Sequence, residues 1–353
     1  MGCGPSKHDK DAIKPPSSDA GKKWKYDWPK GADPSGPLTE KGIKARIEKW
    51  HGASTLKLEC GLTLRFAALT QRGYYPHQPD KANQDAFSVV PSVTKEGHWF
   101  AVYDGHGPCG EKISGYAREH VSKRFKSARE AELKSVDDAL SVAHLAANTE
   151  VANAPSIDDS QSGSTAVSVF VDSKTGDVYV ANVGDSRAML GTQPAGSAKI
   201  KASALSQDQT PYRPDERARV KKYGARVMTA DQIDGNKPLH EDWTCELGEE
   251  IDNDGDPPRL WAPDGDYPGT AFTRSIGDRL AEEIGVVADP EARDARARAR
   301  APRPIFWPRA KGRARGGGLW HPRDVTSRAP LRSRAVRVAR PLPARGGRSR
   351  STR

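Results

Sequence analysis

A short apolar run that ends in a glycine-rich bend constrains this chain more than any other segment. Residues 99–103 are mostly aromatic or β-branched, and Asp104-Gly105-His106-Gly107 follows them directly. Such a run predicts a buried strand, and the two glycines predict that it ends in a sharp bend. The bend would present the Asp104 carboxylate beside the Gly105 carbonyl, and hard divalent cations bind oxygen ligands of this kind. Taken alone, the tetrapeptide is also compatible with an ordinary turn.

The segments that follow show helical and strand periods in turn. Apolar residues recur at helical spacing between 113 and 125, and Ser135 with Asp138 three positions later predicts the start of a second helix. Runs of β period at 166–171 and 178–183, separated by a turn-rich segment, predict a hairpin. Pro214 and Gly224 predict the two ends of a third helix. Antiparallel strand pairs with helices grouped between them indicate an α+β domain.

Carboxylates occur in three segments that could serve phosphate chemistry. Direct hydrolysis of a phosphomonoester needs a strong nucleophile, which two divalent ions about 3.5 to 4 Å apart can generate from water. Asp104 is one candidate ligand, Asp85 precedes a β-type run, and Asp185 lies in a glycine turn after the 178–183 run. His106 is close enough to Asp104 to act as an acid for the leaving group. A simple turn at Asp185 and a hydrogen-bonding role for His106 are the plainer alternatives.

The order and spacing of these motifs resemble the protein phosphatase 2C (PP2C, or PPM) family, in particular its plant, algal and protist branch. The resemblance covers roughly residues 60–291. The segments that carry it are 81–87, 102–107, 162–166 (SGSTA), 181–190 (ANVGDSRAML) and 270–278 (TAFTRSIGD), with lesser matches at 208–211, 223–227 and 284–291.

The resemblance implies a β-sandwich of two antiparallel sheets flanked by helices. It also implies hydrolysis of phosphoserine and phosphothreonine in proteins by water activated between two Mg²⁺ or Mn²⁺ ions. Asp104 would bridge both ions, the Gly105 carbonyl would bind one of them, and Asp85 would hold that same ion through water. His106 would be the general acid. Asp185 would belong to a third, weaker metal site. By the same resemblance Asp278, in the last motif, is interpreted as structural.

Three departures from the family pattern bear on activity. Gln84 stands where many members have glutamate, and the arginine that binds substrate phosphate has no exact counterpart, so that Arg72 or Lys81 is the candidate. The late Asp-Gly and Asp-Asn motifs, expected after residue 291, are absent, which implies a domain incomplete at its C-terminal end. The alternative function is therefore a catalytically impaired PP2C-like pseudophosphatase that acts as a membrane-tethered binding module.

Charge divides the chain into parts. Residues 291–353 hold 18 Arg and 1 Lys against 3 acidic residues, a balance of +16 that leaves −6 for the rest of a chain whose net charge is +10. We expect a lipidation signal and flexible arm at 1–55, with a short helical pattern near 41–50, and a phosphatase domain at 56–291. The remaining 292–353, rich in Arg, Ala, Pro and Gly, is expected not to fold, and a translated intron or shifted frame is our hypothesis for it. Since the tail lacks an aromatic stacking motif, nucleic acid is not an expected partner.

The amino terminus predicts modification. Met1-Gly2-Cys3-Gly4-Pro5-Ser6 fits the myristoylation pattern, with Gly2 as the acceptor. Palmitoylation of Cys3 would supply the second signal that stable anchoring needs, although a free thiol is the plainer alternative. No stretch approaches the roughly 20 apolar residues of a membrane span. We expect a cytoplasmic, monomeric signalling enzyme with phosphoprotein substrates. Its amino-terminal lipid would anchor it to the cytosolic face of a membrane.

Overall fold

The computed structural model describes residues 44, 46–73, 75, 81–131, 135–193, 200–243 and 256–294. All of them belong to the first of two compact units, Met1–Arg303. Gly2, Cys3 and residues 295–353, where the late aspartate motifs were expected, lie outside these described ranges. Within them, no helix has the length and apolar character needed to cross a membrane.

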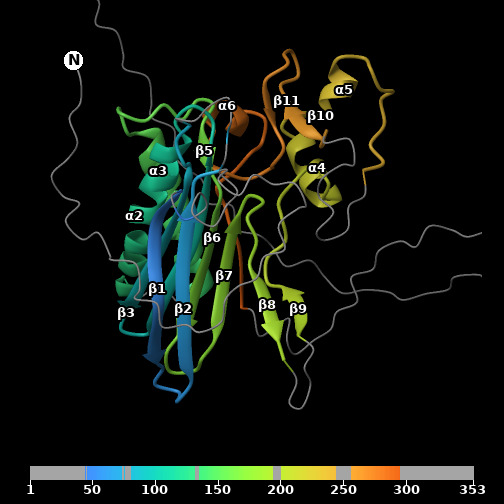
Figure 1. The fold of residues 1–353 in the computed structure, drawn as a ribbon. Helices are drawn as coiled ribbons and strands as arrows, with labels where there is room; N and C mark the ends of the chain where they lie inside the picture. Colours follow the sequence, from blue (N-terminus) through green and yellow to red (C-terminus); the bar gives the residue numbers. More distant parts are fainter. Residues whose placement is uncertain are drawn as a thin grey trace, which may run out of the picture. The chain divides into compact units, whose positions relative to one another are not determined.

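The largest element is a seven-stranded sheet whose neighbouring strands all pair antiparallel (Figure 1). Its order is β13-β5-β4-β6-β7-β14, with β3 paired to β4. The hairpin predicted from two β-period runs is confirmed as β6 and β7. The strands are β3 Asp85–Thr94, β4 Gly97–His106, β5 Gly163–Ser164, β6 Ala166–Asp172, β7 Val178–Val183, β13 Ile276–Gly277 and β14 Glu291–Asp294.

Two long helices, α2 Gly110–Glu130 and α3 Val136–Ala152, cover one face of this sheet. The apolar stripe predicted on α2 is buried against inward-facing side chains of β4, and the rings of Trp99 and Phe125 lie 5.2 Å apart. Burying each large side chain of this kind stabilises the fold by roughly 1.5 to 3 kcal/mol. The predicted start of α3 is also confirmed, because the Ser135 hydroxyl accepts a hydrogen bond from the Asp138 NH at 3.0 Å.

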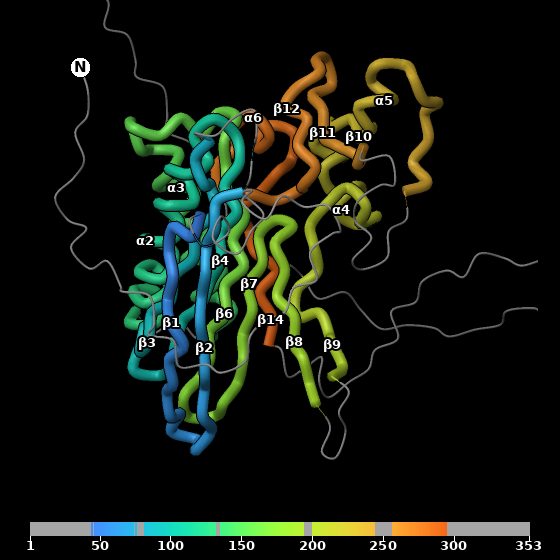
Figure 2. Tube along the Cα trace, in the orientation of Figure 1, coloured from blue at the N-terminus to red at the C-terminus, as the bar shows by residue number. Residues whose placement is uncertain are grey.

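Two separate hairpins lie on the other face of the sheet (Figure 2). One consists of β1 Ile47–Lys57 and β2 Thr63–Gln71, and the other of β8 Met189–Thr192 and β9 Lys201–Ala204. Phe66 of β2 packs edge-on against Phe100 of β4 at 5.1 Å, and Leu205 packs with Val167 and Val180. The expected α+β architecture, with antiparallel sheets facing each other and helices outside, is confirmed.

A smaller group of elements has its own apolar cluster, centred on Val220, Leu260 and Val286. It contains a three-stranded sheet, β10 Arg226–Met228, β11 Arg259–Trp261 and β12 Pro268–Thr270, together with α4 Pro214–Lys221, α5 Ala230–Ile233 and α6 Arg279–Glu282. Pro214 opens α4 as predicted, and Gly224 follows it with a φ of +92°, a left-handed conformation that suits glycine.

The helical pattern expected near residues 41–50 is wrong for residues 47–50, which belong to β1. Leu56 pairs with Leu64 and Trp50 with Leu69 across the β1–β2 hairpin, and His51 packs on Phe66 at 5.2 Å. The short pattern suggested a helix, but cross-strand contacts decide the structure of a marginal segment. β1 also runs through residue 55, where we expected the arm to end.

Candidate active site

Asp104 lies where β4 changes partners. Residues 97–102 of β4 pair with β6, whereas Gly105 and His106 pair with β5. Thr165, between those two partner strands, bonds the Asp104 backbone twice: its NH donates to the Asp104 carbonyl at 2.9 Å, and its hydroxyl accepts from the Asp104 NH at 3.0 Å. The predicted bend therefore exists. It is held through the Asp104 main chain, and Asp104 as a residue is exposed.

Gly105 occupies a position that admits no side chain. A Cβ there would lie 2.4 Å from the Gly110 carbonyl oxygen and 2.6 Å from that of Gln84, and both are main-chain atoms that cannot yield. The Gly105 NH donates to the Gln84 carbonyl at 3.0 Å. This close approach joins the strand end to the start of α2.

Asp85 opens β3 directly opposite Asp104 in the β3–β4 register. Paired positions of neighbouring strands point to the same face of a sheet, so both carboxylates lie on the face away from the helices. Both line one cavity of about 270 Å³. Its lining residues are Leu69, Thr70, Gln71, Asp85, Ala86, Phe87, Val102, Tyr103, Asp104 and Ser186.

Asp185 follows β7 in a turn that Gly184 makes with a φ of +95°. The buried Gln209 holds this turn, because its Oε1 accepts from the Gly184 NH at 2.7 Å and its Nε2 donates to the Asn182 carbonyl at 2.9 Å. The next residue, Ser186, lies with its hydroxyl 2.6 Å from that of Thr165. Thr165 thus links the Asp185 turn to Asp104.

The acidic groups disfavour one another's charge. Partial desolvation, together with the negative charges of Asp85 and Asp185, raises the pKa of Asp104 to about 6. Desolvation also raises the pKa of Asp185. A divalent cation would relieve this repulsion, and the oxygen donors present are those that Mg²⁺ and Mn²⁺ prefer.

These three aspartates alone do not form a closed cage. Among the described residues, only Asp215, Glu216 and Glu291 bring three ligand atoms within 4.8 Å of one another. Ligands at Asp104 would therefore include the Gly105 carbonyl and water.

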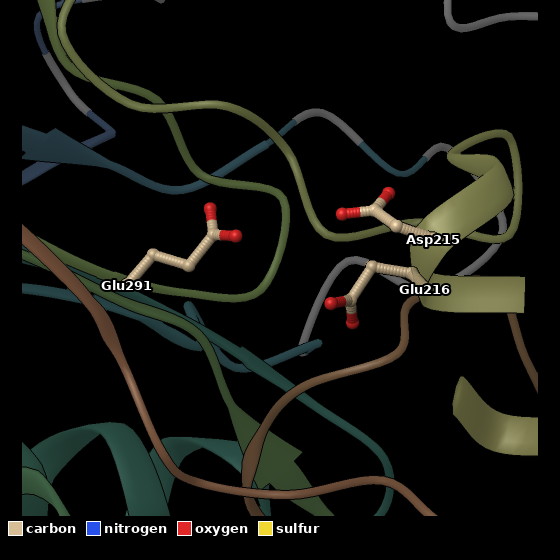
Figure 3. A group of neighbouring side chains, drawn as sticks. All are labelled: Asp215, Glu216 and Glu291. Atoms are coloured by element: carbon tan, nitrogen blue, oxygen red, sulfur yellow. The ribbon is translucent and has the colours of Figure 1, made fainter. Parts of the chain in front are cut away.

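The closer carboxylate cluster is an ion-pair network. Figure 3 shows the side chains of Asp215, Glu216 and Glu291 directed toward a common space. Arg213 bonds both Asp215 and Glu291, at 2.7 and 2.8 Å, while Arg274 bonds Glu216 at 2.7 Å. Guanidinium groups thus supply the positive charge there, and the cluster fastens β14 to α4.

His106 contacts Asp278, a residue whose motif was interpreted as structural. Its Nε2 lies 2.6 Å from Oδ2 of Asp278, and its ring packs on Phe272 at 4.5 Å. Burial acts to lower the pKa of His106, but the hydrogen bond to Asp278 and the charges of Asp278, Asp104 and Asp185 outweigh it and raise the pKa. The two residues are 172 positions apart, so no local signal in the sequence pointed to this pair.

Gln84 serves the loop after β4. Its Nε2 donates to the Gly107 carbonyl at 2.6 Å and to the Glu111 carboxylate at 3.3 Å. A glutamate could donate neither bond. The glutamine at position 84, where many family members have glutamate, therefore makes two hydrogen bonds that depend on its amide group.

The two candidates for substrate phosphate lie on exposed or half-exposed chain near β2 and β3. The Lys81 ammonium lies 4.2 Å from the centre of the Tyr75 ring, and the Arg72 NH donates to the Arg46 carbonyl. Neither contact involves the three aspartates, and a role for Lys81 or Arg72 in phosphate binding stays a prediction.

Comparison with known proteins gives consistent matches. The family model "Protein phosphatase 2C" matches residues 78–300. "Probable protein phosphatase 2C 35" of Arabidopsis thaliana is 44% identical over 264 residues, which are 73% of this chain and 72% of that protein. "Probable protein phosphatase 2C 64" of Oryza sativa subsp. japonica is 33% identical over 59% of this chain, but the match spans only 45% of that relative.

Solved structures match more distantly. The serine-threonine phosphatase 2C of Toxoplasma gondii is 20% identical, covers 61% of this chain and 69% of its own, and superposes with a TM-score of 0.46.

Proposed function

This chain belongs to the protein phosphatase 2C family, and we propose that its Asp104 end of β4 is the centre at which it hydrolyses phosphoserine and phosphothreonine in proteins. The family's members are metal-dependent protein serine/threonine phosphatases. The family match and the relatives do not favour the alternative of a pseudophosphatase binding module. The observation that supports the proposed site most is the opposition of Asp85 and Asp104 in register at adjacent strand ends.

The proposed metal ligands are the Asp104 carboxylate and the Gly105 carbonyl, and the Asp85 carboxylate would hold one ion through water. Two bound Mg²⁺ or Mn²⁺ ions would supply a nucleophilic water and neutralise phosphate charge. Thr165 and the packed Gly105 position would hold the backbone of Asp104 and Gly105 in place before any cation arrives, because both residues are hydrogen-bonded through their main-chain groups. Asp185 would serve a third ion, and Lys81 or Arg72 would contact the substrate phosphate.

His106 is the proposed proton donor to the departing seryl or threonyl oxygen. Its side chain is 27% exposed, which gives a substrate access to the ring. The raised pKa keeps more of the imidazole protonated near neutral pH than an ordinary histidine would be, as a general acid requires.

A phosphopeptide assay with Mn²⁺ tests the proposed function. The unmodified chain should release phosphate, and an Asp104→Ala variant should not exceed the metal-free background. Asp159→Asn is the matched control, since Asp159 is a buried acid paired with Arg279 at 3.2 Å. Hydrolysis by Asp104→Ala at the rate of the control would refute the assignment of the site.

We also propose that Gly2 is myristoylated, with Cys3 as a second acylation site, and that the protein is held at a cytosolic membrane face. The support is the amino-terminal pattern alone. Mass spectrometry of the amino-terminal peptide should show a myristoyl group. The Gly2→Ala variant should lose both this group and the membrane association of the protein. An unacylated Gly2 in the natural host would refute the proposal.

A further inference from the structure

A buried carboxylate lies directly behind His106. The Asp278 side chain is 3% exposed, and its Oδ2 lies 2.6 Å from the imidazole Nε2. This distance is that of a short, charge-assisted hydrogen bond. The Phe272 ring packs on the imidazole and restricts its plane.

The backbone is strained to place this carboxylate. Asp278 has a φ of +57°, and Ser92 is the other non-glycine residue of the described chain with a positive φ. The Asp278 NH donates a hydrogen bond to the Ser162 carbonyl at 2.8 Å. Strain of this kind persists where the surroundings enforce it, and it concentrates at functional sites.

The space for the carboxylate is also reserved. A Cβ on Gly163 would lie 1.9 Å from the Asp278 Oδ2. The glycine in β5 therefore lets the carboxylate lie against the end of β4, where His106 is.

A purely local role does not account for Asp278. It stands at the N-cap position of α6, but its side chain makes no capping hydrogen bond. The nearby buried acid Asp159 pairs with an arginine, whereas Asp278 pairs with an imidazole at the candidate centre.

We propose that Asp278 is a positioning residue for the phosphatase reaction, which accepts a hydrogen bond from Nε2–H of His106 and so turns Nδ1 toward the substrate. This inference rests on the proposed function. As the bond between phosphorus and the seryl oxygen breaks, that oxygen keeps the bonding electron pair and takes the proton from Nδ1. The attacking water forms the new P–O bond and gives up its proton to solvent, from which His106 is reprotonated.

Comparing two leaving groups separates the proposed role of Asp278 from a purely structural one, because structural damage would slow both substrates alike. A phosphoserine peptide expels an alkoxide that needs a proton, whereas p-nitrophenyl phosphate expels a stable phenolate that does not. Asp278→Asn keeps the size of the side chain and tolerates the positive φ. With this variant, kcat for the peptide should fall by about 10²-fold or more, the range that general acid catalysis contributes, and kcat for p-nitrophenyl phosphate by less than about threefold. Equal losses on the two substrates, or no loss on either, would overturn the proposal.

Two further variants make the test specific. Asp159→Asn should retain the rates on both substrates. His106→Ala should show the same split as Asp278→Asn, and the double variant should be no slower than His106→Ala, because the two residues act as one unit. Additive losses would contradict the proposed coupling.

The unmodified protein gives an answer even if Asp278→Asn does not fold. Nitrogen-15 NMR of the His106 side chain should show the neutral imidazole carrying its proton on Nε2. A proton on Nδ1 instead would overturn the proposal. If the unmodified chain hydrolyses neither substrate, the proposed function itself fails; if it does so and Asp278→Asn keeps both rates, only this inference fails.

Discussion

The Thr165 hydroxyl lies between Asp104 and Ser186: it accepts a hydrogen bond from the Asp104 NH at 3.0 Å, and it is 2.6 Å from the Ser186 hydroxyl. One side chain thereby ties the end of β4 to the turn that carries Asp185. The relative positions of the Asp104 and Asp185 carboxylates thus depend on Thr165, a residue that is not itself a candidate ligand or catalytic group.

Replacing Thr165 with valine should loosen this link. Valine has nearly the same shape but no hydroxyl, so the Asp104 NH loses its acceptor, at a cost of about 1 to 3 kcal/mol in the free energy of unfolding. Urea denaturation should show this loss, and calorimetry should show several-fold weaker Mn²⁺ binding. Thr149→Val is the matched control, since its hydroxyl bonds a carbonyl on the exposed side of α3. Indistinguishable behaviour of the two variants would contradict the role given to Thr165.

Replacing Glu216 with glutamine should damage the ion-pair network of α4. Burial acts to raise the pKa of Glu216, but Arg274, Arg219 and Thr273 outweigh it and lower the pKa to about 2. Removing the charge leaves the largely buried Arg274 without its main partner, and a loss of about 3 to 5 kcal/mol is expected. Because the folded pKa lies below the unfolded value, this contribution is present above about pH 4.5 and is lost as the pH falls toward 2. An acid titration in which the wild type and Glu216→Gln differ equally at pH 7 and pH 2 would contradict it.

His144 should make the fold sensitive to mild acid. It is fully buried, its Nδ1 donates to the Leu140 carbonyl at 2.8 Å, and its Nε2 lies 3.1 Å from the Ser168 hydroxyl. Burial lowers its pKa from 6.5 to about 4. The unfolded chain therefore binds a proton that the folded chain does not, and stability falls as the pH drops from 6.5 to 4, by about 3 kcal/mol in all.

Urea denaturation at a series of pH values checks this expectation. His144→Asn should be less stable at neutral pH but should lose less stability between pH 6.5 and 4 than the wild type. The same slope in both proteins would show that His144 does not carry the effect.

Replacing Gln84 with glutamate should destabilise the metal-free protein. The new carboxylate would face the Gly107 carbonyl and the Glu111 carboxylate that the amide now bonds, at a cost of about 1 to 3 kcal/mol. Mn²⁺ should recover part of this loss, because an added negative charge beside the proposed site attracts a cation. Thermal unfolding with and without Mn²⁺ tests both parts, with the exposed Gln161→Glu as control. A metal-free Gln84→Glu protein as stable as that control would contradict the expectation.

Local patterns predicted those parts of the fold that local contacts determine. The strand at residues 99–103, the hairpin of β6 and β7 and the start of α3 at Ser135 all depend on periodicity or on contacts within a few residues. Residues 47–50 of β1 were predicted as part of a helical pattern, because the structure of this strand depends on pairing with β2 rather than on its own spacing.

The candidate site was predicted in part. Motif order identified Asp104, Gly105, Asp85 and His106, and the structure brings Asp85 and Asp104 together at one sheet end. Motif order did not identify Asp278 as the partner of His106 or Arg213 as the partner of Glu291, since these contacts join positions 172 and 78 residues apart. Only the fold brings such residues together.

Calorimetric titration of the full chain with Mn²⁺ is the decisive measurement, because every step of the proposed reaction depends on cation binding at Asp104 and Gly105. We expect heat of binding from the unmodified chain and from Asp159→Asn, and a loss of that heat in Asp104→Ala with the fold intact. Equal binding by Asp104→Ala, or none by the unmodified chain, would contradict the account.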